Sequence, residues 1–289
     1  MFHLLAIFAV VVWGTTFVST KTLIFHGLTP TEIFIYRFAL AYVSILFISH
    51  GRLFSSSISD ELLLVAAGIT GGSLYFVTEN SALGLTRASN VAMIISICPL
   101  LTTLLAMAIS RSERGRNPWR VVAGSLIALI GVAVVVYNGR MVMQFNLRGD
   151  MLTLAAALSW AVYSLLIKRL GRRYDAAFMT RKVFAYGLLS IGLWELLGPS
   201  PQPLRLHLLT DRVVIANLLF LGFVASMLCF TVWSAVVKRI GMVKSTNYIY
   251  LNPIVTFISA YLILGERLSA VSLAGAAVIL AGVYIVEKR

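Results

Sequence analysis

Ten runs of apolar residues follow one another along the 289-residue chain. Glycine, proline and charged residues separate the runs, as in the segment GPSPQP at 198–203. A helix of about 20 apolar residues crosses the hydrocarbon core of a bilayer, and in lipid only a helix or a closed barrel satisfies its own backbone. The pattern therefore predicts an all-α membrane protein with ten transmembrane helices, to within a few residues at 3–21, 31–49, 62–84, 88–110, 119–137, 150–168, 181–198, 213–236, 243–264 and 270–287.

Composition supports a membrane setting. Apolar residues make up 59% of the chain, charged residues 12%, and the mean hydropathy is +0.90. Soluble domains are usually about 45–50% apolar. Ten spans would leave residues only for short loops, which excludes a separate soluble domain. The first run has no basic region ahead of it and no clear cleavage site, so we expect a retained span.

The distribution of positive charge predicts the orientation. The net charge of +13 sits mainly in short loops between apolar runs, which argues against nucleic-acid binding. With the N-terminus in the cytoplasm, cytoplasmic segments carry 16 Lys and Arg residues and outer segments carry 7, while Arg37 lies within a span. Cytoplasmic loops are enriched in Lys and Arg. We therefore expect both termini in the cytoplasm.

The chain lacks the residue clusters that metal or enzyme chemistry requires. Cys98 and Cys229 fall inside apolar runs, where packed thiols are expected. The four histidines lie in loops or near the terminus, and none pairs with cysteine or a carboxylate at a ligand spacing. No phosphate-binding loop or catalytic triad occurs. The expectation is therefore no metal, no cofactor and no enzymatic activity.

Landmarks in the first half recur in the second. Trp13 and Trp160 stand 147 positions apart, and each is followed eight residues later by a lysine. Pro99 and Pro253, in the fourth and ninth runs, stand 154 positions apart. The alternative is chance similarity between leucine-rich helices, but the matches occur in the same order. They predict a duplicated five-helix unit.

A duplicated unit with an odd number of spans enters the membrane from opposite sides in its two copies. We place the first five-helix repeat at 1–139 and the second at 149–289. Inverted repeats are typical of secondary transporters, which bind substrate near the midplane between the repeats. The fold prediction is therefore two inverted five-helix repeats, a 5+5 arrangement.

Several motifs resemble the drug/metabolite transporter superfamily, and most closely its EamA-type ten-span transporters. They are WGxxF at 13–17, Pro30 with Arg37, ALxxTxAS at 82–89, PxxT at 99–102, and NP at 252–253 followed by GERL at 265–268. The resemblance covers both halves. It implies residence in the bacterial cytoplasmic membrane, a central cavity, and export or import of amino acids and related small metabolites by alternating access. The chain departs from the commoner pattern at Glu79 and Asn80.

Two charged residues fall within predicted spans. Arg37 and Glu79 both lie roughly 8–9 Å below the outer surface, at about 1.5 Å per helical residue. Their equal depth and opposite charge predict an ion pair. Two interpretations are open: Glu79 carries a proton or cation and Arg37 gates it, or the pair fixes two helices structurally.

Further candidates come from polar and aromatic faces. Trp13 with Thr16, and Trp160 with Tyr163, share faces of the first and sixth runs, and each face either lines a wet cavity or packs against helices. In the ninth run, Pro253 frees a backbone carbonyl one turn earlier and is predicted to kink the helix, as is Pro99 in the fourth. The predicted cavity set is Trp13, Thr16, Glu79, Asn80, Asn90, Trp160, Tyr163, Trp233, Tyr248 and Asn252.

Three functions compete at this stage. The first is a metabolite exporter driven by an ion or substrate gradient. The second is an enzyme acting on lipid-linked groups, which would require a cluster of reactive side chains. The third is a lipid flippase or scaffold without metabolite flux. Flux of amino acids into proteoliposomes separates the first from the others.

Overall fold

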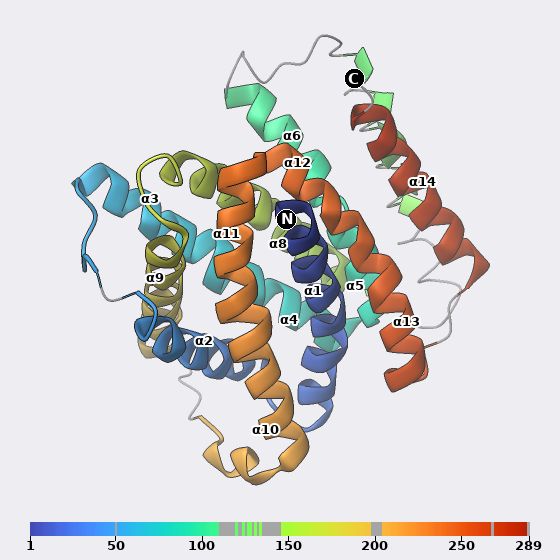
Figure 1. The fold of residues 1–289 in the computed structure, drawn as a ribbon. Helices are drawn as coiled ribbons and strands as arrows, with labels where there is room; N and C mark the ends of the chain where they lie inside the picture. Colours follow the sequence, from blue (N-terminus) through green and yellow to red (C-terminus); the bar gives the residue numbers. More distant parts are fainter. Residues whose placement is uncertain are drawn as a thin grey trace.

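The computed structural model is all-helical wherever it describes the chain (Figure 1). It describes residues 1–49, 51–109, 146–197, 204–266 and 269–287 and, between these, 119–120, 123–124, 126–128, 130–131 and 133–134. The helices of the first half are α1 (Phe2–Phe25), α2 (Pro30–Leu46), α3 (Ile58–Gly68), η1 (Ile69–Ser73), α4 (Leu74–Leu85), α5 (Ala88–Ile95) and α6 (Cys98–Ile109). Those of the second half are α8 (Leu147–Leu170), α9 (Ala176–Leu197), η3 (Leu206–Thr210), α10 (Arg212–Leu219), η4 (Phe220–Leu228), α11 (Cys229–Ile240), α12 (Met242–Thr246), η5 (Asn247–Leu251), α13 (Asn252–Leu264) and α14 (Ala270–Glu287).

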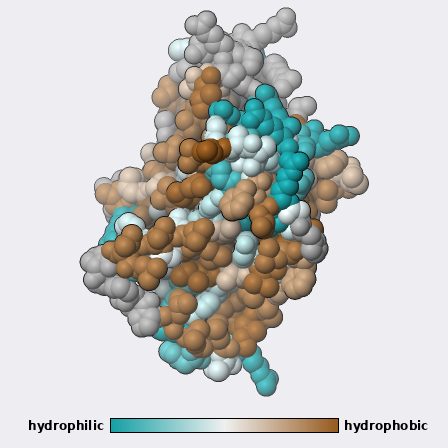
Figure 2. Space-filling model, turned by 90° about the vertical axis from the view of Figure 1, so that its left-hand side faces the viewer, coloured by the Kyte–Doolittle hydropathy of each residue, from teal (hydrophilic) through white to brown (hydrophobic). Residues whose placement is uncertain are grey.

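Five of the described helices are long and apolar enough to cross a membrane. They are Phe2–Phe25, Ile58–Leu85, Ala88–Ile109, Leu147–Leu170 and Arg212–Ile240. Apolar side chains also cover broad areas of the outer surface, as the brown regions of Figure 2 show. Exposed apolar patches of this extent are typical of surfaces that contact lipid or another protein. The predicted all-α membrane fold is confirmed. Of the 19 residues of the fifth predicted span, 119–137, the structure describes 11, and all of these are helical.

The two halves repeat the same helix irregularities. In the third and eighth spans, a π-helical segment interrupts the α-helix, as η1 between α3 and α4 and as η4 between α10 and α11. The fourth and ninth spans are broken near their middles, and a new helix starts there with Pro99 or Pro253 in its first turn. Proline fits a first turn because that position needs no intrahelical N–H partner. Each predicted kink thus lies at a break between two helices.

Close helix packing at glycines holds the halves together. A Cβ on Gly71 of the third span would lie 2.2 Å from Cδ2 of Tyr163 on α8, and one on Gly68 would lie 2.5 Å from Cβ of Tyr186 on α9. In the same way Gly282 of α14 approaches the backbone of Ala128. Small residues let membrane helices approach closely. The contacts of Gly68 and Gly71 join the third span of the first half to α8 and α9 of the second.

Short polar motifs fix the ends of several helices. At the start of α2, the Thr29 hydroxyl accepts from the Glu32 amide and the Glu32 carboxylate accepts from the Thr29 amide, a complete capping box. At the start of α10, Asp211 accepts from the Val213 amide and contacts His26 of the first half at 2.8 Å. The amide and His26 both favour the charged carboxylate, and so lower the pKa of Asp211. His26 and Asp211 thereby link the two halves at the helix ends.

Candidate functional site

A narrow central cavity lies between the two halves, and the space in it that a water-sized molecule can reach is about 30 Å³. The first half contributes residues from α1, α2, α4, α5 and α6, and the second half from α8, α11, η5 and α13. The lining residues are Trp13, Thr16, Phe17, Arg37, Tyr75, Phe76, Glu79, Ile95, Cys98, Trp160, Phe230, Ile249 and Asn252. Both broken spans reach the cavity near their breaks, through Cys98 and Asn252. A site between repeats and beside broken helices matches the geometry of secondary transporters.

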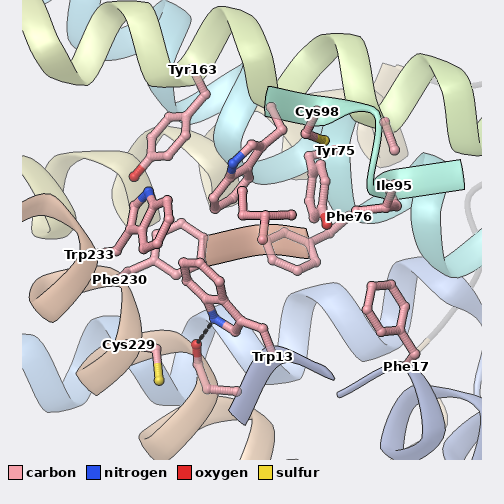
Figure 3. Close-up of a cluster of buried hydrophobic side chains, with 14 of the residues drawn as sticks. Trp13, Phe17, Tyr75, Phe76, Ile95, Cys98, Tyr163, Cys229, Phe230 and Trp233 are labelled. Atoms are coloured by element: carbon pink, nitrogen blue, oxygen red, sulfur yellow. Dashed lines mark hydrogen bonds between the residues drawn. The ribbon is translucent and has the colours of Figure 1, made fainter. Parts of the chain in front are cut away.

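Six aromatic side chains line the cavity, and several of their rings contact one another (Figure 3). The Trp13 ring meets the rings of Trp160 and Trp233 at centroid distances of 5.3 and 5.0 Å. Its indole N–H donates to the carbonyl of Ala225 at 2.9 Å, which fixes the orientation of the ring. Phe230 contacts both Trp13 and Trp160. These rings offer an apolar surface that suits a flat or branched apolar group.

A buried carboxylate occupies one side of the cavity. Glu79 on α4 is 3% exposed, and its Oε1 accepts a hydrogen bond of 2.8 Å from the hydroxyl of Tyr75, one turn earlier on the same helix. Burying a charged carboxylate is costly unless a partner stabilises it. Glu79 is therefore suited to bind a cationic group or a proton in this cavity.

Arg37 presents a buried cation to the same cavity. Its Nε donates to the Ser226 hydroxyl at 2.5 Å, and its guanidinium lies 4.1 Å from the centroid of the Phe76 ring. Within the described residues no salt bridge joins the guanidinium to Glu79, although the two opposite charges line the same cavity and attract each other across it. Arg37 and Glu79 line one cavity, and Ser226 and Phe76 are the groups that the guanidinium contacts there.

Within the described ranges of the chain, three buried polar atoms on cavity-lining residues have no hydrogen-bond partner. They are the donors Arg37 Nη1 and Trp160 Nε1 and the acceptor Asn252 Oδ1. Buried polar groups in proteins are nearly always paired, so each such atom calls for an explanation. Two donors and one acceptor, together with the Glu79 carboxylate, can bind a molecule that carries both an anionic and a cationic group.

The sequence-predicted cavity residues divide into two groups. Trp13, Thr16, Glu79, Trp160 and Asn252 line the cavity, as Arg37 does. The others lie elsewhere: Asn80 donates to the Pro30 carbonyl, Asn90 to the Thr86 hydroxyl, Tyr248 contacts His3 at 2.6 Å, and Tyr163 and Trp233 pack behind Trp160 and Trp13.

Sequence reasoning missed most of the aromatic wall. Phe17 is four residues after Trp13, and Tyr75 is four residues before Glu79, so helical periodicity places each on a predicted face. Extending the predicted faces by one helical turn from Trp13 and from Glu79 would have identified Phe17 and Tyr75. Phe230, Ile249, Ile95 and Cys98 carry no such signal, because apolar residues are common at every position of a membrane helix.

The comparison with family models decides the classification. The model described as the EamA-like transporter family matches residues 1–137 and 147–287. The chain belongs to the EamA-like transporter family. It is therefore a multi-pass membrane transporter of small molecules and not an enzyme, as the motifs predicted.

Several relatives of this EamA-like transporter cover most of its length. A probable amino-acid metabolite efflux pump of Salmonella typhimurium is 31% identical over 97% of this chain and 93% of that protein. The corresponding Escherichia coli protein is 27% identical, with the same shares. A probable terminal-alkyne amino-acid exporter of Streptantibioticus cattleyicolor is 30% identical over 80% of this chain and 74% of its own length. A solved crystal structure has a TM-score of 0.64 at 20% identity, over 98% of this chain and 95% of that one, which shows the shared fold.

Proposed function

We propose that this EamA-like transporter exports amino acids, or closely related zwitterions, by alternating access across the bacterial cytoplasmic membrane, with both termini in the cytoplasm. The central observation is that one cavity holds Arg37 and Glu79 without a salt bridge between them. Two buried opposite charges that leave each other unpaired are suited to separate groups of one substrate. The names of the efflux relatives support the same substrate class.

The cavity chemistry suggests how such a substrate would be oriented. The free N–H groups of Arg37 and Trp160 suit a carboxylate, and the Glu79 carboxylate and the Asn252 carbonyl suit an ammonium group. Hydrogen bonds to charged groups contribute about 1.5–3 kcal/mol each. The substrate side chain would then lie against the rings of Trp13 and Phe230. Large apolar side chains should therefore bind more tightly than small or charged ones.

Glu79 is also the residue we propose for coupling to a proton or cation. It is the carboxylate on the cavity wall, and within the part of the chain that the structure describes its one hydrogen-bond partner is Tyr75 on the same helix. A carboxylate that exchanges an ammonium group for a proton would link substrate release to ion entry. If Glu79→Gln retained full ion-coupled transport, Glu79 would only bind substrate or support the fold.

A thermal-shift screen with matched analogues tests the proposed substrate. Purified protein in detergent is melted with leucine, phenylalanine and their analogues: the methyl ester lacks the carboxylate charge, the decarboxylated amine lacks the carboxylate, and the N-acetyl form lacks the ammonium charge. A ligand that binds only the native state raises its melting temperature. We expect stabilisation by an intact amino acid and loss of it in all three analogues.

The same screen on variants locates the binding site. Trp160→Ala should abolish the ligand-induced shift, because Trp160 forms part of the wall and carries a free N–H. Glu195→Gln is the matched control, since Glu195 lies near the end of α9 and outside the cavity lining. Stabilisation by the methyl ester or the amine equal to that by the amino acid would contradict the proposed recognition.

A further inference from the structure

Hydrogen bonds between the halves cross the end of the bundle opposite the N-terminus, here called the distal end. The carboxylate of Glu266, which follows α13 in the second half, accepts from the amides of Ala88 and Ser89 at 2.9 and 3.2 Å and from the Ser89 hydroxyl at 2.7 Å. Ala88 and Ser89 begin α5 in the first half. A helix N-terminus has free N–H groups and a positive dipole end, both of which favour a carboxylate.

A second contact closes the same end from another direction. The ammonium of Lys21 on α1 donates to the carbonyl of Thr86, in the turn between α4 and α5. One short turn, residues 86–89, is thus bound by Lys21 on one side and by Glu266 on the other. Because Glu266 comes from the second half, opening the distal end there requires its hydrogen bonds to break.

Helical periodicity places these contacts over the cavity. Lys21 follows the lining residue Phe17 by four positions, about 6 Å further along the same face of α1. Thr86 directly follows Leu85, the last residue of α4, the helix that carries the lining residue Glu79. Ala88 precedes Ile95, which also lines the cavity, by seven positions on α5. Three helices that line the cavity therefore lead to one network.

We infer that Glu266, Lys21 and the turn 86–89 form the distal gate of the transport pathway. The inference rests on the proposed function, because a gate has meaning only in alternating access. Three of its hydrogen bonds end on the single carboxylate of Glu266, so a movement of that one side chain releases all three. The gate controls passage between the cavity and the distal end and does not contact substrate in the cavity.

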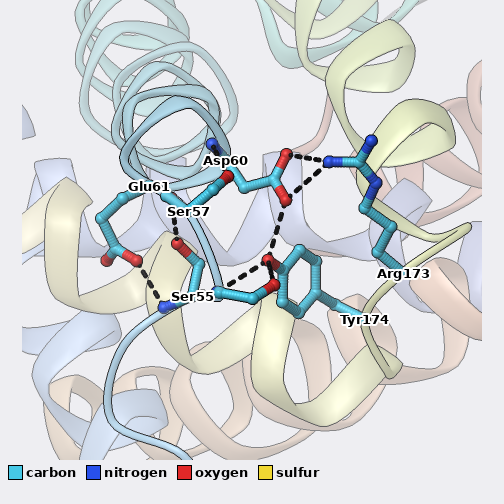
Figure 4. Close-up of polar contacts among 7 residues, drawn as sticks. Ser55, Ser57, Asp60, Glu61, Arg173 and Tyr174 are labelled. Atoms are coloured by element: carbon cyan, nitrogen blue, oxygen red, sulfur yellow. Dashed lines mark hydrogen bonds and ion pairs between the residues drawn. The ribbon is translucent and has the colours of Figure 1, made fainter.

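The opposite end carries its own link between the halves, which supplies a matched control (Figure 4). Asp60, in the first turn of α3, accepts from Arg173 at 3.0 and 2.9 Å and from the Tyr174 hydroxyl at 2.9 Å. Asp60 and Glu266 are thus both carboxylates that join the halves by three hydrogen bonds, at opposite ends of the bundle. Loosening the Asp60 link should leave the distal gate closed.

The chain contains a natural reporter for opening of the distal gate. Cys98 lines the cavity and is 1% exposed, and the other of the two cysteines, Cys229, is buried outside the lining. In a Cys229→Ala background, membrane-impermeant thiol reagents are added to one face of sealed vesicles, whose orientation is established by protease access to a C-terminal tag. The rate of Cys98 modification from each face then measures access to the cavity without any substrate.

Glu266→Gln should raise the rate of Cys98 modification from the distal face at least threefold, and Ser89→Ala, which removes one bond, should raise it less. Asp60→Asn should leave that rate unchanged. Lys21→Met removes the second contact, the hydrogen bond to the Thr86 carbonyl, and should also raise the rate of Cys98 modification from the distal face. If gel filtration shows that Glu266→Gln does not fold, Lys21→Met alone decides whether the gate exists. Rates unchanged in all folded gate variants, or an equal rise in Asp60→Asn, would overturn the gate. If the gate variants behave as expected but no amino acid stabilises the protein, the gate stands and only the proposed substrate is refuted.

Discussion

Gly71→Ala tests how tightly the two halves pack behind the cavity. The new Cβ would lie 2.2 Å from Cδ2 of Tyr163, whereas ordinary contacts begin at 3.4 Å, so the ring or its helix must move by about 1.2 Å. Tyr163 is fully buried and packs on Trp160 at 5.0 Å and Phe230 at 6.0 Å. Because Trp160 and Phe230 line the cavity, a displacement of the Tyr163 ring is transmitted to the cavity wall.

Overpacking of this kind costs about 1–3 kcal/mol. We expect Gly71→Ala to lower the melting temperature of the purified protein by several degrees and to weaken substrate binding, although residue 71 does not line the cavity. Gly84→Ala on α4 is the control, since a Cβ there meets no atom within 4 Å and should leave both quantities nearly unchanged. Equal melting curves for Gly71→Ala and the wild type would refute the described contact between the third span and α8.

Three further substitutions separate binding from folding. Arg37→Met should abolish stabilisation by the amino acid. The melting temperature without ligand should change little, because a buried charge without a salt bridge is costly to keep. A large fall in the melting temperature without ligand would contradict this. Asn80→Ala should destabilise the protein by about 0.5–1.5 kcal/mol through its lost bond to Pro30, with ligand affinity unchanged by titration. Asn252→Ala should weaken ligand affinity in the same titration and change the stability of the protein little. Unchanged affinity would show that Asn252 does not bind the substrate.

The sequence was sufficient to predict the architecture because lipid imposes strong constraints. Runs of about 20 apolar residues must form helices in a bilayer, so helix content could be predicted without homologues. The repeated Trp13 and Trp160 revealed the duplication, and both residues meet at the cavity with their rings 5.3 Å apart. The broken spans were anticipated because proline lacks the backbone N–H that a continuous helix needs.

The side-chain arrangement could be predicted only in part. The position of a residue along a helix predicts its depth in the membrane, and Arg37 and Glu79 both line one cavity. The contacts of each side chain also depend on the rotation of its helix about the axis and on the neighbouring groups. Ser226 and Phe76 are the groups that the Arg37 guanidinium contacts, and the sequence contains no indication of that. Tyr248 shares a helical spacing with Asn252, yet the 3₁₀ turn η5 changes that register and Tyr248 contacts His3 instead.

Counterflow in proteoliposomes tests the central claim most directly. Vesicles loaded with an unlabelled amino acid that stabilises the protein are diluted into the labelled compound, and uptake is followed for the wild type, Trp160→Ala and Glu195→Gln. We predict transient accumulation of label in the wild type and in Glu195→Gln, and none in Trp160→Ala. Absence of accumulation for every amino acid in wild-type vesicles, or undiminished accumulation in Trp160→Ala, would contradict transport of amino acids through this cavity.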